Sequence, residues 1–134
     1  MTSPAASSHP SVVVVEDDPD LLSALTFAFE IEGFEVRAYP DAEAVAAVGD
    51  VPADACLVLD VRLPGMDGLA LLEQIRSRFG ERPALMITTP TADIVRRAAA
   101  AGVAIVEKPL LSDSLIRQVR SMLAAHGGRP ADSD

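Results

Sequence analysis

Two hydrophobic periods alternate along the chain, one typical of buried strands and the other of amphipathic helices. Five short runs rich in apolar residues predict strands, at Val12–Val15, Phe34–Ala38, Ala55–Leu59, Pro83–Thr88 and Val103–Val106. The first and third runs are continuously apolar, which indicates strands that are buried on both faces of a sheet.

Helical spacing fills the segments between and after these strands. Apolar residues recur there at helical intervals, in the stripes Leu22, Leu25 and Phe29; Ala44, Val45 and Val48; Leu72, Ile75 and Phe79; and Leu115, Val119 and Met122. Asp41 and Asp67 are expected N-caps, because a carboxylate there accepts hydrogen bonds from the amides of the first turn. Gly33, Gly102 and Gly127 are expected helix ends, and an alanine-rich helix precedes Gly102.

Strands that alternate with helices in this way predict an α/β fold. Five βα units give a doubly wound, five-stranded parallel sheet with right-handed crossovers and helices on both faces. Ligands of such folds bind at the carboxyl ends of the strands. We therefore expect the chemistry in the residues that directly follow each strand.

Length and charge narrow the class of protein. The 134 residues suffice for one domain, which we place at residues 11–126, between a short disordered lead at 1–10 and a polar tail at 127–134. Twenty acidic residues against eleven basic ones give a formal net charge of −9, which disfavours binding to nucleic acid or to an anionic membrane. Neither a membrane span of about 20 apolar residues nor a signal peptide is evident, so we expect a soluble cytoplasmic protein. The single cysteine, Cys56, is expected to be a small buried hydrophobe.

Carboxylate, hydroxyl and ammonium side chains stand at four of the expected strand ends. Glu16 and Asp17 follow the first strand, Asp60 follows the third, Thr88 ends the fourth, and Lys108 follows the fifth. Because the carboxyl ends of parallel strands meet at one edge of a sheet, we expect these side chains to lie close together.

Carboxylates gathered at one place repel each other, and a single lysine does not balance them. A divalent cation with oxygen ligands does, and Mg²⁺ typically takes one or two carboxylates, keeps several waters and leaves room for a phosphate. A carboxylate beside such an ion can attack phosphorus and form an aspartyl phosphate, while an ammonium and a hydroxyl neutralise the phosphoryl oxygens. These residues together indicate phosphoryl transfer. Asp18, next to the acidic pair, is better explained as a helix N-cap.

Over residues 11–126 the chain resembles the receiver domains of bacterial two-component response regulators, and within them the receivers of nitrogen-fixation regulators. Four motifs carry the resemblance in the same order along the chain. They are Val-Val-Val-Val-Glu-Asp-Asp ending at Asp18, Leu-Val-Leu-Asp-Val-Arg-Leu-Pro-Gly-Met-Asp-Gly ending at Gly68, Ile87-Thr88, and Glu107-Lys108-Pro109. The resemblance implies a flavodoxin-like sheet with strand order 2-1-3-4-5.

The same resemblance implies a role for each matching residue. Asp60 would be the phosphoacceptor, Thr88 would hydrogen-bond the phosphoryl group, and Lys108 would pair with it. The implied ligands of Mg²⁺, for which Mn²⁺ can substitute, are Glu16, Asp17, Asp60 and the main-chain carbonyl of Arg62. The bond between Lys108 and Pro109 would be cis.

Two positions depart from the family pattern. Ile105 stands where the family usually has Tyr or Phe, a ring that turns inward when the threonine moves. Thr89, followed by Pro90, stands where Ala or Gly usually leaves the phosphoryl group open. We expect the phosphorylated lifetime and the switching to differ from the usual pattern, and phosphate acceptance to remain, because neither change removes a ligand.

These observations favour a single-domain response regulator, a phosphoacceptor and not an enzyme. Its partner would be a sensor histidine kinase or a phosphotransfer protein, docked near Pro19, Asp20 and Ser23. The alternatives are a pseudo-receiver that signals by contact without phosphate, and a phosphate sink or shuttle in a phosphorelay. A Mg²⁺-dependent phosphatase is disfavoured, because Arg62 stands where such enzymes place a second acid.

Four arginines bear on oligomeric state. Arg96, Arg97, Arg117 and Arg120 lie on the last two expected helices, on the face formed by the fourth helix, fifth strand and fifth helix that related receivers use to dimerise. A homodimer interface and an ordinary solvated helix face both explain them.

Overall fold

The structure is a computed structural model that describes residues 10–107 and 112–127. Residues 1–9 of the expected lead, residues 128–134 of the expected tail, and the segment 108–111 lie outside the described residues. Lys108 and the bond between Lys108 and Pro109 belong to that last segment.

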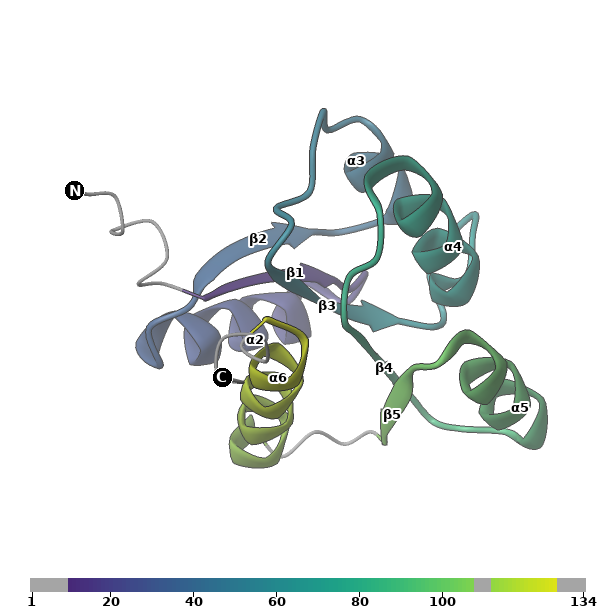
Figure 1. Cartoon of the computed structure of the whole chain (residues 1–134). Coiled ribbons are helices and arrows are strands. Elements are labelled where there is room, and N and C mark those ends of the chain that lie inside the picture. The colour runs from purple at the N-terminus through teal and green to yellow at the C-terminus, as the bar shows by residue number, and fades with distance from the viewer. Residues whose placement is uncertain (1–9, 108–111, 128–134) are drawn as a thin grey trace.

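Five parallel strands form one sheet in the order β2-β1-β3-β4-β5 (Figure 1). The strands are β1 (Ser11–Val15), β2 (Glu35–Tyr39), β3 (Ala55–Asp60), β4 (Ala84–Thr88) and β5 (Ala104–Glu107). The helices are α2 (Pro19–Ile31), α3 (Ala42–Ala46), α4 (Gly68–Phe79), α5 (Ala92–Ala101) and α6 (Ser112–Gly127). The α/β fold and the strand order 2-1-3-4-5 are therefore confirmed, and the strand ends differ from the sequence prediction by one residue at most.

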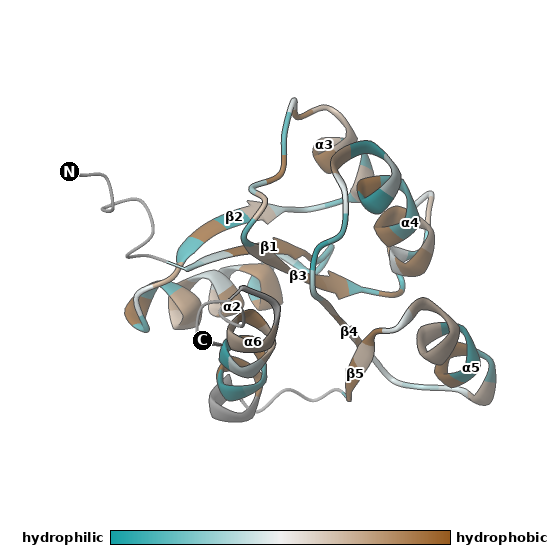
Figure 2. Ribbon diagram, in the orientation of Figure 1, coloured by the Kyte–Doolittle hydropathy of each residue, from teal (hydrophilic) through white to brown (hydrophobic). Residues whose placement is uncertain are grey.

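The helices cover both faces of the sheet (Figure 1). Val12 and Val14 of β1 pack with residues of α2 and α6, such as Phe29 and Leu115, on one face. The alternate β1 residue Val13 packs on the other face with residues of α3, α4 and α5. In Figure 2 the inner strands are mainly apolar, whereas the edge strand β2 and the helices carry polar residues as well. A sheet covered on both faces explains why its central strands are continuously apolar.

The helix starts follow the predicted caps. Asp18, Asp41 and Asp67 each accept a hydrogen bond from an amide in the first turn of the following helix. One helix is shorter than predicted, because α3 ends at Ala46 and leaves Val48 outside it. The Val48 amide donates to the carbonyl of Val45 at 3.1 Å in a tighter turn.

The buried side chains of Cys56 and Arg82 lie away from the carboxyl ends of the strands. Cys56 in β3 is fully covered, as predicted, and burial raises the pKa of its thiol to about 12. The buried guanidinium of Arg82 donates to the carbonyl oxygens of Pro52 at 2.9 Å, Val51 at 2.6 Å and Phe79 at 2.6 Å. It thereby joins the segment before β3 to the end of α4, a contact that the sequence pattern did not predict.

None of the helices in the described parts of the chain has the length and apolar character that crossing a membrane requires.

Candidate functional site

Three of the predicted metal ligands meet at the carboxyl edge of the sheet. Glu16 and Asp17 follow β1 directly, and Asp60 is the last residue of β3, the strand paired with β1. One carboxylate oxygen from each of the three lies within 4.8 Å of the others. Asp60 is far from Glu16 and Asp17 in the sequence, and the three meet because β1 and β3 are neighbours in the sheet.

The burial of these carboxylates differs. Glu16 is 1% exposed and Asp60 is 2% exposed, whereas Asp17 is exposed to solvent. Anionic groups are stable in such a position when cationic or hydrogen-bonding groups surround them. An all-oxygen set with one solvent-exposed member fits Mg²⁺, which prefers carboxylates and retains part of its water shell.

Backbone amides fix the rotation of the two buried carboxylates. The Asp18 amide donates to Oε2 of Glu16 at 3.0 Å, and the Arg62 amide donates to Oδ1 of Asp60 at 3.0 Å. In each case the donor lies two residues after the acid. Arg62 is thus placed at the site by its amide, a contact that sequence reasoning missed, whereas a role of its carbonyl as a metal ligand stays a prediction.

A glycine packs against the backbone of the buried aspartate. The amide of Gly68, at the start of α4, donates to the carbonyl of Val61 at 2.8 Å. A Cβ atom at this position would lie 2.2 Å from the carbonyl oxygen of Asp60. Any residue other than glycine must therefore displace α4 from the end of β3. The motif that ends in Asp67-Gly68 contained this signal, but its steric reason is visible only in three dimensions.

The fourth strand brings a hydroxyl to the same edge. Asp60 is in register with Ile87, and Thr88 is the next residue of β4 and is 1% exposed. The Oγ1 atom of Thr88 donates to the carbonyl of exposed Thr89 at 3.5 Å, a long and weak hydrogen bond. The role of Thr88 toward a phosphoryl group stays a prediction. So does that of Lys108, which lies outside the described residues.

The remaining sequence-predicted positions are Ile105 of β5 and the four arginines of α5 and α6. Ile105 is half-buried and packs against the apolar cluster under α3, α4 and α5. Within the described parts of the chain, Arg96 pairs with Asp93 at 3.3 Å, Arg97 with Asp67 at 2.7 Å, and Arg120 with Glu32 at 3.3 Å. Arg117 is exposed. Homodimerisation through this face stays a prediction.

A family model described as the response regulator receiver domain matches residues 12–120. Among curated proteins, the transcriptional regulatory protein FixJ of Azorhizobium caulinodans is 34% identical over 128 residues, which cover 91% of this chain and 60% of FixJ. The DNA-binding response regulator MtrA of Mycolicibacterium smegmatis is 34% identical over 124 residues, which cover 90% of this chain and 54% of MtrA. The chain thus spans little more than half the length of these relatives.

Solved structures share the fold. A CheY-like receiver domain protein from Methanospirillum hungatei superposes with a TM-score of 0.79 at 23% identity, covering 88% of this chain and 96% of that one. The crystal structure of FixJ-N superposes with a TM-score of 0.74 at 28% identity, covering 87% and 94%. The family match runs from β1 into α6 and includes Glu16, Asp17 and Asp60, and the chain belongs to the response regulator receiver domain family.

Proposed function

We propose that this receiver domain accepts a phosphoryl group on Asp60, with Mg²⁺ present, from the phosphohistidine of a sensor histidine kinase or a phosphotransfer protein. The observation that carries the proposal is the meeting of Glu16, Asp17 and Asp60, with carboxylate oxygens within 4.8 Å of one another. Membership of the receiver family supports the choice of donor. The domain acts as an acceptor in the cytoplasm, and the kinase supplies the transferred group.

The proposed transfer is a displacement at phosphorus. A carboxylate oxygen of Asp60 forms a bond to phosphorus while the bond from phosphorus to the donor imidazole breaks, and the imidazole nitrogen keeps the electron pair and takes up a proton. The Arg62 amide holds the carboxylate rotation. Glu16, Asp17 and Asp60 would hold Mg²⁺, which would supply positive charge for the phosphoryl oxygens. Thr88 donates a hydrogen bond to the transferred group, and Lys108 pairs with it.

The start of α2 supports a docking position for the donor. Pro19, Asp20 and Ser23 are exposed, and α2 begins directly after the acidic pair. A donor that contacts this turn would hold its histidine near the carboxyl edge of the sheet. We place the kinase or phosphotransfer protein there, and the output in a protein contact that depends on phosphorylation.

The test is phosphorylation of Asp60→Asn by radiolabelled acetyl phosphate in the presence of Mg²⁺. The wild-type chain should take up acid-stable, base-labile label, and the variant should take up none, because its amide is not a nucleophile toward phosphorus. Asp50→Asn is the matched control, since Asp50 is an exposed aspartate away from the strand ends that pairs with Arg37 at 3.6 Å. Label on Asp60→Asn equal to that on the control would refute the proposal.

The alternative of a pseudo-receiver predicts a different binding result. A chain that no longer uses phosphate should bind neither Mg²⁺ nor beryllofluoride, which mimics the phosphoryl group. Our proposal predicts binding of both, and a weakened Mg²⁺ affinity in Asp17→Asn. The alternative of a phosphate sink or shuttle is distinguished by adding an unphosphorylated phosphotransfer protein to the labelled chain and measuring return of the label.

A further inference from the structure

Helix α5 has few apolar anchors. Of its ten residues, only Ile94 and Ala98 are buried, and Val95 is 50% exposed. The second half of the helix is the run Ala98–Ala101, whose methyl groups reach little of the neighbouring surface. The position of α5 therefore depends more on polar contacts than that of a helix with large buried side chains.

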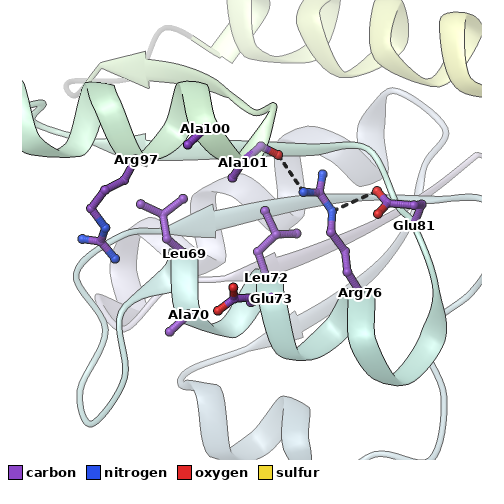
Figure 3. A pocket seen from close by; sticks show the side chains of 9 residues that line it. All are labelled: Leu69, Ala70, Leu72, Glu73, Arg76, Glu81, Arg97, Ala100 and Ala101. Carbon is purple, nitrogen blue, oxygen red and sulfur yellow. Dashed lines mark hydrogen bonds and ion pairs between the residues drawn. The ribbon is translucent and has the colours of Figure 1, made fainter.

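A cavity of about 530 Å³ separates part of α5 from α4 (Figure 3). Leu69 and Leu72 of α4 and Ala100 and Ala101 of α5 line its apolar part. The cavity exists because the alanines of α5 do not fill the space opposite the leucines of α4. Space of this kind lets a helix move without compressing a packed core.

Two arginines connect the helices at opposite ends of the cavity. At one end, a guanidinium nitrogen of Arg97 on α5 lies 2.7 Å from a carboxylate oxygen of Asp67, the N-cap of α4. At the other end, Arg76 of α4 donates at 2.7 Å to the carbonyl of Ala101, the last residue of α5 (Figure 3). The two contacts hold α5 against α4.

The Asp67–Arg97 pair also joins the two chain segments that leave the candidate site. Asp67 immediately precedes Gly68, whose amide bonds to Val61 next to Asp60. On the other side, only residues 89–91 separate Thr88 from α5. Partial burial raises the pKa of the Asp67 carboxyl, but hydrogen bonds from Ala70 and Arg97 outweigh it, so its pKa lies below the ordinary value. Asp67 is therefore ionised, and paired, at neutral pH.

We propose that the Asp67–Arg97 ion pair is a latch that holds α5 in the position described here and opposes the change that a phosphoryl group on Asp60 favours. The inference rests on the proposed function. If Thr88 moves toward the phosphoryl group, the three-residue connection passes that movement to α5. The ion pair stabilises the position of α5 before the movement, so its removal raises the free energy of that position and makes the change to the moved state less unfavourable.

The first test measures the affinity for beryllofluoride, with Mg²⁺, by titration calorimetry. Arg97→Ala should bind about two- to five-fold more tightly than wild type, the range expected from losing one partly exposed ion pair. Arg96→Ala is the matched control, because Arg96 pairs with Asp93 on its own helix and should leave the affinity unchanged. Arg97→Lys, which retains the charge, should stay close to wild type.

A second variant separates the ion pair from the helix cap. Asp67→Ser removes the carboxylate but keeps an N-cap oxygen for the Ala70 amide, so it should reproduce the tighter binding of Arg97→Ala. The double variant should gain no more than either single variant, because both remove the same contact. Additive gains, or a gain in Arg96→Ala equal to that in Arg97→Ala, would overturn the latch.

Hydrogen–deuterium exchange without Mg²⁺ or beryllofluoride tests the latch independently of phosphorylation. Arg97→Ala should raise the exchange of α5 amides relative to Arg96→Ala, and unchanged exchange would overturn the proposal. A wild-type chain that binds no beryllofluoride would refute the proposed function instead. The exchange comparison would then decide by itself whether the ion pair restrains α5.

Discussion

Helices α4 and α5 lie on the same face of the sheet and are similar in length, but they are held in different ways. The sequence gives α4 leucine and isoleucine at its inward positions, and five of its twelve residues are buried. At the inward positions of α5 it gives one isoleucine, Ile94, and otherwise alanine, and two of the ten residues of this helix are buried. Each fully buried Leu or Ile contributes about 1.5–3 kcal/mol, whereas a partly exposed ion pair contributes at most about 1 kcal/mol.

This difference has a functional meaning at the carboxyl edge of the sheet. Helix α4 begins beside Asp60 and is fixed by apolar packing and by the close contact at Gly68, which under the proposed function keeps the accepting carboxylate in place. Helix α5 begins after Thr88 and is held by polar contacts of Arg97, in its middle, and of the carbonyl of Ala101, at its end. Under the proposed function, a fixed helix beside Asp60 and an adjustable helix beside Thr88 would suit a two-state switch.

The largest expected change in the free energy of unfolding comes from a substitution that weakens the apolar packing of α4. Leu72→Ala removes a buried side chain that is 1% exposed and should lower the free energy of unfolding by about 2–5 kcal/mol. Val95→Ala on α5 is the comparison and should change it by less than about 0.5 kcal/mol. Chemical denaturation of the two variants measures the difference. Similar losses in both would show that α5 is packed as firmly as α4.

A substitution at the start of α4 should lower the stability less but should strongly lower the rate of phosphorylation. Gly68→Ala places a Cβ atom against the carbonyl oxygen of Asp60, which should cost about 1–3 kcal/mol of stability. Displacement of the acceptor by about 1 Å should slow phosphorylation by acetyl phosphate on the order of 100-fold.

The control for that variant is Gly49→Ala. A Cβ atom there meets no other atom within 4 Å, so stability and phosphorylation rate should stay near wild type. Equal phosphorylation rates in the two alanine variants would contradict the positioning role of Gly68.

The smallest effect concerns pH and the Asp67 cap. The pKa of Asp67 is lower in the folded chain than in the unfolded one, where it is about 3.9. The stability that ionised Asp67 contributes is therefore fully present above the unfolded pKa and is lost as pH falls through the folded pKa. The unfolding free energies of wild type and Asp67→Ser should differ by less than about 1 kcal/mol at neutral pH and converge in acid. A difference that grows on acidification would contradict this sign.

Local signals in the sequence predicted most of the fold. The valine run of β1 and the alternation of strands with helices predict a parallel sheet, whereas its strand order 2-1-3-4-5 follows from the resemblance to receiver domains. Asp18, Asp41 and Asp67 are recognisable as caps. The acidic group of the site followed from the rule that carboxyl ends of parallel strands meet.

Long-range contacts of single polar residues were not predictable in this way. Arg82 gives no sign in the sequence that it is buried among carbonyl groups, because its partners lie at the end of α4 and in the segment before β3, which are far apart in the sequence. Arg97 was assigned to an outward helix face, yet it reaches the cap of α4. Such contacts depend on how two loops approach each other, and no hydrophobic period records that approach.

The buried thiol of Cys56 is a built-in probe for opening of the sheet. Its high pKa and its position in the middle of the sheet keep it unreactive while β3 remains in place. A disulfide reagent therefore reaches the sulfur when the sheet itself opens, and the modification rate reports how often that happens. Because the chain has a single cysteine, the rate refers to one known atom, and each variant can be compared with wild type by the same reaction.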